Sequence, residues 1–405
     1  MLGFLVYCSG ISGQRAFHPN VRSLSVSNPY DFMAPPVIRM GTADKLNINF
    51  DLIDEDREYL RYRVLHCNAD WVPSRLMESE YLNGFNEVPI DDYAFSSNTY
   101  IHYVNYNITL PDEQLPILVS GNYLLQVFPE EDPDIILLEV PFSVSEEKSL
   151  ISGGVTSRTD KGVNTEYQQL FLEIDTNNLP GINPYQDLIV TVTQNNRKET
   201  TQTLSHPIRV ERGKVVFEHS PQLIFEAGNE YRRFETVRTD YPGMHVDSVK
   251  FINDIWHAWL QPDFSRLHKE YVFDKTQHGR FKIDDYNSSD PNLGADYVMV
   301  HFTLDPGNRQ YGSIYLDGDF TNHVFDESNL LRYDWNDGLY HASIPLKQGS
   351  YNYQYVVIPD KGGFPSPTPI EGNKYETLNE YLVKVFLRLP GARADRLIVT
   401  QVLNF

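Results

Sequence analysis

The sequence predicts an all-β protein made of three consecutive immunoglobulin-like or early-set-like β-sandwich domains. Aromatic residues make up 13% of the 405 residues, with 26 Tyr and 22 Phe, and such residues are enriched in strands. Short runs that alternate apolar and polar residues recur along the chain, with Gly, Asn and Asp clusters between them. The length suits two to four domains of ordinary size.

The N-terminal domain is expected over residues 16–146. Its predicted strands cover residues 21–27, 45–53, 59–67, 100–110, 121–128 and 135–144. Six or seven short strands separated by turn-forming residues are typical of a β-sandwich. Residues 146–162 are polar and rich in Gly, which predicts a linker to the next domain.

A connection of about thirty residues joins the strands at 59–67 and 100–110. Pro73 ends the first strand, and Ser74 can cap a short helical turn that would place Met77 and Tyr81 on one face. A loop of this length is usually functional or disordered, and its aromatic content argues against disorder. It either packs on its own sheet, the interpretation favoured for Trp71, or presents side chains to a partner. The candidate residues are Trp71, Met77, Tyr81, Phe85, Tyr93 and Phe95.

A middle sandwich is expected over residues 150–290. Its predicted strands cover residues 167–175, 188–194, 215–219, 231–237, 246–252 and 271–274, and Asn195-Asn196 suits a tight turn. His245, His257 and His268 have no metal-ligand spacing, and the Trp256-His257-Ala258-Trp259 segment predicts a polar contact inside an aromatic cluster. No metal is expected here.

The loop before the last domain resembles a calcium loop only in part. Asp285, Asn287, Ser289 and Asp296 fall at positions 1, 3, 5 and 12, but position 6 is Asp290 where the turn needs Gly. An acidic interdomain loop is the better interpretation.

The C-terminal domain is expected over residues 293–405, with strands at 381–389 and 396–403 completing its sandwich. Its Gly-Asp-Phe turn and its Tyr351, Tyr353, Tyr355 strand resemble the early-set modules that bind glycogen and starch. In those modules exposed aromatics stack on sugar rings, and Trp335 is the candidate here. The favoured alternative is that the tyrosine face packs on its own sheet, because aromatics mostly serve cores.

Charge and motifs exclude several function classes. The net charge of −21 makes binding to nucleic acid or to an anionic membrane improbable. Cys8 lies in an apolar leader and Cys67 in a predicted strand, so no disulfide is expected. His66 and Cys67 are adjacent on a strand and point to opposite faces, so they cannot act as base and nucleophile. No enzyme activity and no cofactor are predicted.

The first residues are apolar and then small. They predict the remnant of a signal peptide over residues 1–15, with cleavage after Gly13, and the alternative is a first β-strand.

Several ordered segments carry a family resemblance. HCNADWVPSRLMESEYLNGF, YAFSSNT, FEAGNEYRRFE, EGNKYETLNEYLVKVFLR and ADRLIVTQVLNF together resemble the type IX secretion system plug protein family of Bacteroidetes. The resemblance implies a monomeric periplasmic protein that binds the mouth of the large outer-membrane translocon barrel and closes it. The aromatic loop would then contact the barrel rim or brace the domain that does so. The alternative function is a polysaccharide-binding surface protein that uses the C-terminal domain, and a hydrolase ranks last.

Overall fold

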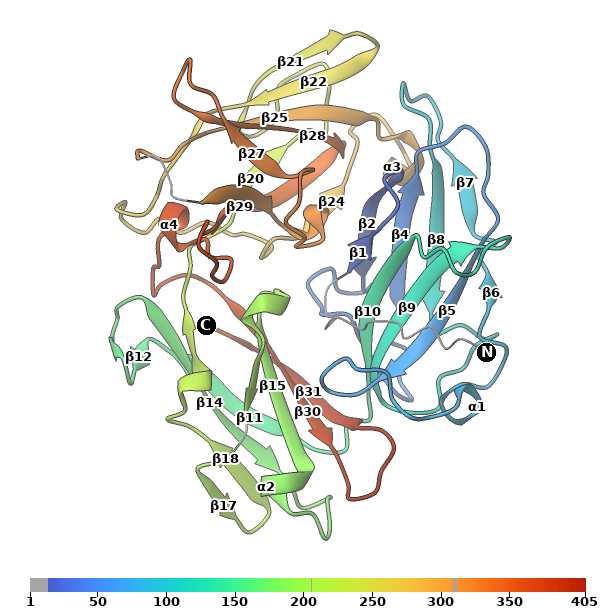
Figure 1. The fold of residues 1–405 in the computed structure, drawn as a ribbon, viewed down its shortest axis with the longest axis vertical. Coiled ribbons are helices and arrows are strands. Elements are labelled where there is room, and N and C mark those ends of the chain that lie inside the picture. Colours follow the sequence, from blue (N-terminus) through green and yellow to red (C-terminus); the bar gives the residue numbers. More distant parts are fainter. Residues whose placement is uncertain (1–13, 205, 309–311) are drawn as a thin grey trace.

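The computed structural model describes residues 14–204, 206–308 and 312–405. The all-β prediction is confirmed, with 45% of residues in strands and 6% in helices. The strands form three units that touch each other around a triangle (Figure 1). Unit I covers residues 14–149, unit II covers 150–227 and 378–405, and unit III covers 228–377. The predicted signal peptide, with Cys8, falls almost entirely outside the described residues.

Unit I consists of two sheets that pack face to face. One sheet has the order β1 (Arg15–Ala16), β10 (Leu138–Ser145), β9 (Gly121–Pro129), β5 (Leu60–Cys67), β6 (Val88–Pro89), with β3 (Val37–Arg39) beside β10. The other has the order β2 (Val21–Ser27), β4 (Leu46–Leu52), β8 (Val104–Leu110), β7 (Tyr93–Phe95). Successive side chains of a strand point to opposite faces of the sheet, which explains how the core between the two sheets is filled. On β5, for example, Leu60, Tyr62 and Val64 are buried and alternate with more exposed residues.

Unit II also has two facing sheets around one core. One contains β11 (Ile151–Thr156), β14 (Tyr167–Asp175), β18 (Lys214–Phe217) and β17 (Arg209–Glu211), with β19 (Ile224–Glu226) beside β14. The other has the order β16 (Gln202–Leu204), β15 (Leu188–Gln194), β30 (Glu380–Leu387), β31 (Arg396–Asn404). A small hairpin joins β12 (Arg158–Thr159) to β13 (Gly162–Val163).

The predicted linker over residues 146–162 is wrong, because Gly153 and Gly154 lie inside β11. A Cβ at Gly153 would come within 2.3 Å of the Phe171 carbonyl oxygen on β14, and one at Gly154 within 2.9 Å of the Phe171 ring. These glycines therefore permit close strand packing instead of a flexible link.

The C-terminal strands do not complete the third sandwich as predicted. β30 pairs with β15 of unit II from Leu188↔Leu387 to Gln194↔Tyr381. The strands expected at 231–237 and 246–252 belong to unit III, and residues 271–274 form no strand. Unit III is thus inserted into unit II, so the strand pairing does not follow three consecutive domains. Periodicity predicts which face of a strand is buried but not which strand lies beside it.

Unit III is a single curled sheet around one core. Its strand order is β20 (Arg232–Glu235), β29 (Gly349–Ile358), β26 (Ser313–Asp317), β27 (Leu330–Tyr333), β28 (Tyr340–Lys347), β25 (Tyr297–Asp305), β22 (Ile255–Leu260), β21 (Val246–Ile252). β23 (Asp263–Phe264) lies beside β25, and β24 (Phe281–Ile283) beside β29.

The helices are single turns. They are α1 (Glu78–Tyr81), α2 (Pro184–Asp187), α3 (Pro291–Gly294), α4 (Thr368–Glu371), η1 (Lys198–Thr200), η2 (Pro221–Leu223) and η3 (Asp319–Thr321). Within the described part of the chain, no helix has the length and apolar character needed to span a membrane.

Candidate functional site

A buried ion pair joins unit I to unit III. Lys347 Nζ on β28 lies 2.7 Å from Asp51 Oδ2 on β4, and both side chains are at most 1% exposed. Tyr297 donates its hydroxyl to the same carboxylate oxygen at 2.7 Å, and Asn105 donates to the other oxygen at 2.7 Å. Lys347 also lies 4.0 Å from the centre of the Tyr103 ring. Every oxygen of the buried carboxylate is thus hydrogen-bonded, as a buried charge requires.

Asp296 makes a second contact between these units. Its carboxylate accepts the backbone N–H groups of Tyr100 at 2.9 Å and Ile101 at 3.2 Å. The last residue of the supposed calcium loop therefore anchors the backbone of the segment that leads into β8.

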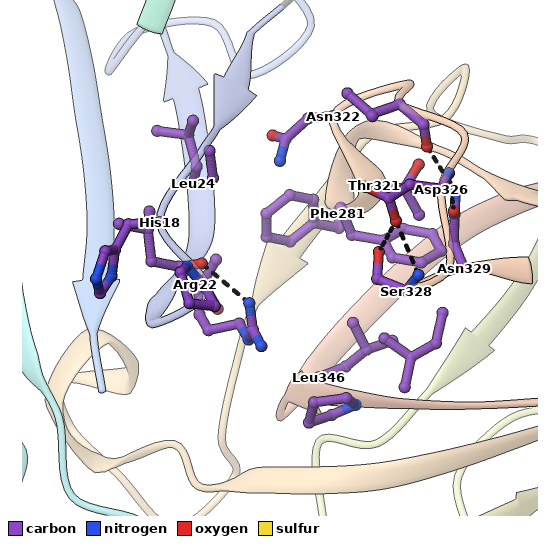
Figure 2. A pocket seen from close by; sticks show the side chains of 18 of the residues that line it. His18, Arg22, Leu24, Phe281, Thr321, Asn322, Asp326, Ser328, Asn329 and Leu346 are labelled. Atoms are coloured by element: carbon purple, nitrogen blue, oxygen red, sulfur yellow. Dashed lines mark hydrogen bonds between the residues drawn. The ribbon is translucent and has the colours of Figure 1, made fainter. Parts of the chain in front are cut away.

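A cavity of about 350 Å³ lies beside this contact. In Figure 2, Arg22 and Leu24 of β2 face Phe281 and Asn322 of unit III across it. On the unit III side, Ser328 donates to Asp326 at 2.6 Å, so these polar groups are engaged with each other. The cavity is a gap in the packing of two units.

Buried charges also join unit II to unit III. Arg197, which follows β15, lies 3.8 Å from Asp317 of β26, and His323 contacts the same carboxylate at 2.8 Å. Although burial alone would raise the pKa of Asp317, His323 and Arg197 lower it to about 2. Although burial opposes protonation of His323, Asp317 and Asp319 hold its pKa well above the ordinary value. The pair is therefore charged at neutral pH.

The aromatic loop of unit I is anchored on unit II. Asp395 accepts the backbone N–H of Ala69 at 2.9 Å, and its own N–H donates to the Asn68 side chain at 3.0 Å. Arg388 forms a two-bond ion pair with Asp395, with both bonds at 2.7 Å. A small apolar cluster of Ala69, Ile189, Phe386 and Leu397 lies beside it. Asp70, by contrast, is exposed and only closes its own turn by accepting the Val72 N–H.

Trp71 forms part of the same contact. Its backbone has φ of 64°, which is rare for a bulky residue, and its ring lies 5.2 Å from Lys384 Nζ of β30. Lys384 donates to Ser143 of β10 at 2.8 Å. Burial lowers the pKa of Lys384 to about 8. Trp71 thus packs within the molecule, between units I and II.

The other predicted loop residues divide into two groups. Tyr81 is 4% exposed and donates to the Val64 carbonyl, and Tyr93 is half-buried under the Arg57 guanidinium at 3.9 Å. Met77, Phe85 and Phe95 are exposed by 65%, 92% and 50%. Met77 and Tyr81 do not share a helical face, because Met77 precedes α1 in an extended conformation.

Met77 and Phe85 flank one side-chain contact within the loop. Each precedes a residue of a hydrogen-bonded pair, since Asn86 donates to Glu78 at 3.0 Å. Asn86 also exchanges hydrogen bonds with the backbone of Val64, which fixes the loop on β5. The nearby β6 ends its sheet on the outer edge of unit I, at the right of Figure 1. This edge therefore presents apolar side chains on an ordered loop.

The tyrosine strand of unit III faces inward. Tyr351, Tyr353 and Tyr355 are at most 1% exposed, so they cannot contact a sugar. Trp335 is 73% exposed, but its ring is perpendicular to that of Tyr333, at 88° and 5.0 Å. The two rings do not form one flat platform, which weakens the glucan-binding alternative.

The sequence did not indicate the charged contacts between units. Asp51 lies between Phe50 and Leu52 on a strand whose last three residues are all buried, and this interruption of an apolar run is the one available signal. Its partner is 296 positions away. Only the fold brings the two together.

Comparisons with known proteins identify relatives of the chain. Residues 21–146 match the family described as type 9 secretion system plug protein 1st domain. A crystal structure of a hypothetical protein from Parabacteroides merdae ATCC 43184 covers 98% of this chain and is itself covered over 100% of its length. It has 38% identical residues and a TM-score of 0.94. No curated protein matches the chain.

Proposed function

Because this chain belongs to the type IX secretion system plug protein family, we propose that it docks on the periplasmic side of the outer-membrane translocon of that system and plugs its channel. In this proposal it is a monomeric, non-enzymatic binding protein located in the periplasm at the outer membrane. Its partner is the large translocon barrel.

The observation that carries the proposal is the pairwise joining of all three units by buried charged or polar contacts. Asp51–Lys347 joins units I and III, Arg197–Asp317 joins units II and III, and Ala69–Asp395 joins units I and II. Separating the buried Asp51–Lys347 pair leaves an uncompensated charge and costs about 3–5 kcal/mol. A stopper for a wide pore needs bulk and resistance to deformation, and three joined units provide both.

We place the docking contact on the outer edge of unit I, within the segment that matches the family. Met77 and Phe85 are exposed there on a loop that is fixed to β5 through Asn86. Aromatic and Met side chains are enriched at protein interfaces, and a preordered loop loses little entropy on binding. Phe95 at the end of β7 is also exposed, but it lies on the other sheet of unit I.

The test is affinity purification of the tagged protein from envelope extracts of its own bacterium, followed by mass spectrometry. We expect a very large outer-membrane barrel protein to be recovered with the wild type. The double variant Met77→Asp/Phe85→Asp should recover it at least tenfold less. Phe364→Asp is the matched control, because Phe364 is 88% exposed on unit III.

Two outcomes would contradict the proposal. Failure of the wild type to recover any barrel protein, together with retention on a glucan column, would replace it with the polysaccharide-binding alternative. Equal recovery by the wild type and the Met77→Asp/Phe85→Asp variant would move the docking contact to another surface.

A further inference from the structure

Two histidines that are far apart in the sequence meet on the outer face of unit III. Nδ1 of His257 on β22 lies 2.9 Å from Nε2 of His301 on β25. The ring planes differ by 7° and the ring centroids are 5.2 Å apart. A centroid separation so much longer than the distance between the nitrogens means that the rings lie edge to edge in one plane. Each nitrogen therefore points at the other.

Trp259 covers this pair. Its ring is nearly parallel to both imidazoles, at 16° and 4.7 Å from His301 and at 19° and 5.6 Å from His257. The indole face of Trp259 thus lies over the contact between the two nitrogens. The face of an aromatic ring attracts cations, and Trp does so best.

A thioether lies on the same face. The parallel pairing of β22 with β25 puts Met299 opposite His257, and His301 opposite Trp259. Met299 and His301 are two residues apart on one strand, so their side chains leave the same side. The intervening Val298 and Val300 are buried in the core, which places Met299 and His301 on the outer side. All four side chains are half-buried, which leaves the face accessible.

The imidazoles are prepared to act as ligands. Ser343 lies 2.7 Å from Nδ1 of His301, and this hydrogen bond orients the ring with Nε2 facing His257. When Nδ1 of His257 carries the proton between the rings, His301 is protonated at Nδ1 and donates to Ser343. Transfer of the His257 proton from Nδ1 to Nε2 then leaves one lone pair on each facing nitrogen, with no net loss of protons.

We propose that His257, His301 and Met299 bind a Cu(I) ion under the Trp259 ring. Imidazole and thioether ligands select soft monovalent copper, whereas Ca²⁺ and Mg²⁺ prefer oxygen ligands. The bonds to the metal are about 2 Å long, as in other histidine sites, so the two facing nitrogens must move apart from 2.9 Å to about 4 Å on binding. The spacing of these residues in the sequence gives no metal motif, because the ligands come from two paired strands.

Lys250 of β21 provides an internal check. Its ammonium lies 5.4 Å from the Trp259 ring and competes with any cation for that ring. Replacement of Lys250 by Leu, which removes the charge without adding a thioether, should therefore strengthen Cu(I) binding severalfold.

The test is anaerobic titration of the full purified chain with Cu(I) in competition with bicinchoninate. We expect one ion to bind per chain. His257→Gln and His301→Gln should each weaken binding at least tenfold, and Met299→Leu should weaken Cu(I) binding without changing Zn²⁺ binding. His219→Gln, an exposed histidine paired with Asp160, should bind as the wild type does. Far-ultraviolet circular dichroism would verify that each variant is folded.

The proposal would be overturned if the wild type failed to compete for Cu(I), or if the double variant His257→Gln/His301→Gln still bound one ion. Equal affinity of Met299→Leu and the wild type would exclude the thioether ligand and with it the selection of Cu(I).

Discussion

Asp51 and Lys347 form an ion pair at the contact between two units, and neither side chain is exposed by more than 1%. Such a pair contributes little net stability relative to a well-packed apolar pair, because both charges have been removed from water. Its effect is to make one arrangement of units I and III much more favourable than any other. Tyr297 and Asn105 satisfy the carboxylate further, so the contact is also specific in geometry.

Removal of one partner should therefore be costly. We expect Asp51→Asn to lower the free energy of unfolding by about 3–5 kcal/mol, because it leaves the Lys347 ammonium buried without a counter-charge. Urea denaturation followed by fluorescence measures this. The double variant Asp51→Asn/Lys347→Met should recover part of the loss. Glu327→Gln, which removes an exposed partner of Arg332, should change the free energy by less than about 1 kcal/mol.

Lys384 gives a prediction that depends on pH. Its pKa is about 8 in the folded protein and has an ordinary value of 10.5. Below pH 8 both states hold the proton and the burial penalty is constant. Between about pH 8 and 10.5 the unfolded state binds more protons, so this group makes the folded state more stable as pH rises. The difference in unfolding free energy between wild type and Lys384→Met should therefore shift in favour of the wild type from pH 7 to pH 10. An unchanged difference would show that Lys384 is fully hydrated.

The strands show how much of the fold can be predicted from the sequence. β2, β14, β15 and β21 have the predicted boundaries, because each is a run of seven or more strand-forming residues next to turn-forming residues. The short β1, β3, β6 and β7 carry too few residues to show a period. The sequence also gave the wrong partners for β30 and β31, since their apolar faces would fit either sheet. Pairing over such sequence distances is decided by the packing of the whole chain.

The same limit applies to the candidate sites. The sequence indicated the aromatic loop as a feature, but it could not separate the buried Tyr81 from the exposed Phe85, because both are large aromatics in an irregular segment. His257 and His301 showed no motif for a related reason, since strand pairing and not sequence spacing brings them together.

The anchoring of the loop predicts a local effect. Asp395→Ala removes the acceptor of the Ala69 N–H and the partner of Arg388, so the segment around residues 68–82 should open more often. We expect faster limited proteolysis within this segment and faster hydrogen exchange there. Asp70→Ala, which affects only an exposed turn, should have a smaller effect. Equal rates of proteolysis and hydrogen exchange in the wild type, Asp395→Ala and Asp70→Ala would contradict the anchoring of this segment by Asp395.

The insertion of unit III into unit II predicts independent folding of the inserted part. Residues 228–377 contain every strand of the curled sheet and its core. We expect this segment, expressed alone, to unfold in one cooperative transition with near-native circular dichroism. Residues 293–405, the domain expected from the sequence, lack β20 to β24 and should not fold.

At the scale of the whole molecule, the three units lie around a triangle (Figure 1). Their contacts include buried charged groups. That form suits a protein that closes an opening by occupying it. The most direct test is the ionic conductance of the purified translocon barrel in a planar lipid bilayer, recorded before and after addition of this protein. We predict that conductance falls to near the level of the bare bilayer, and that the Met77→Asp/Phe85→Asp variant leaves the channel open at the same concentration. Binding of the protein with undiminished conductance would contradict the claim that it is a plug.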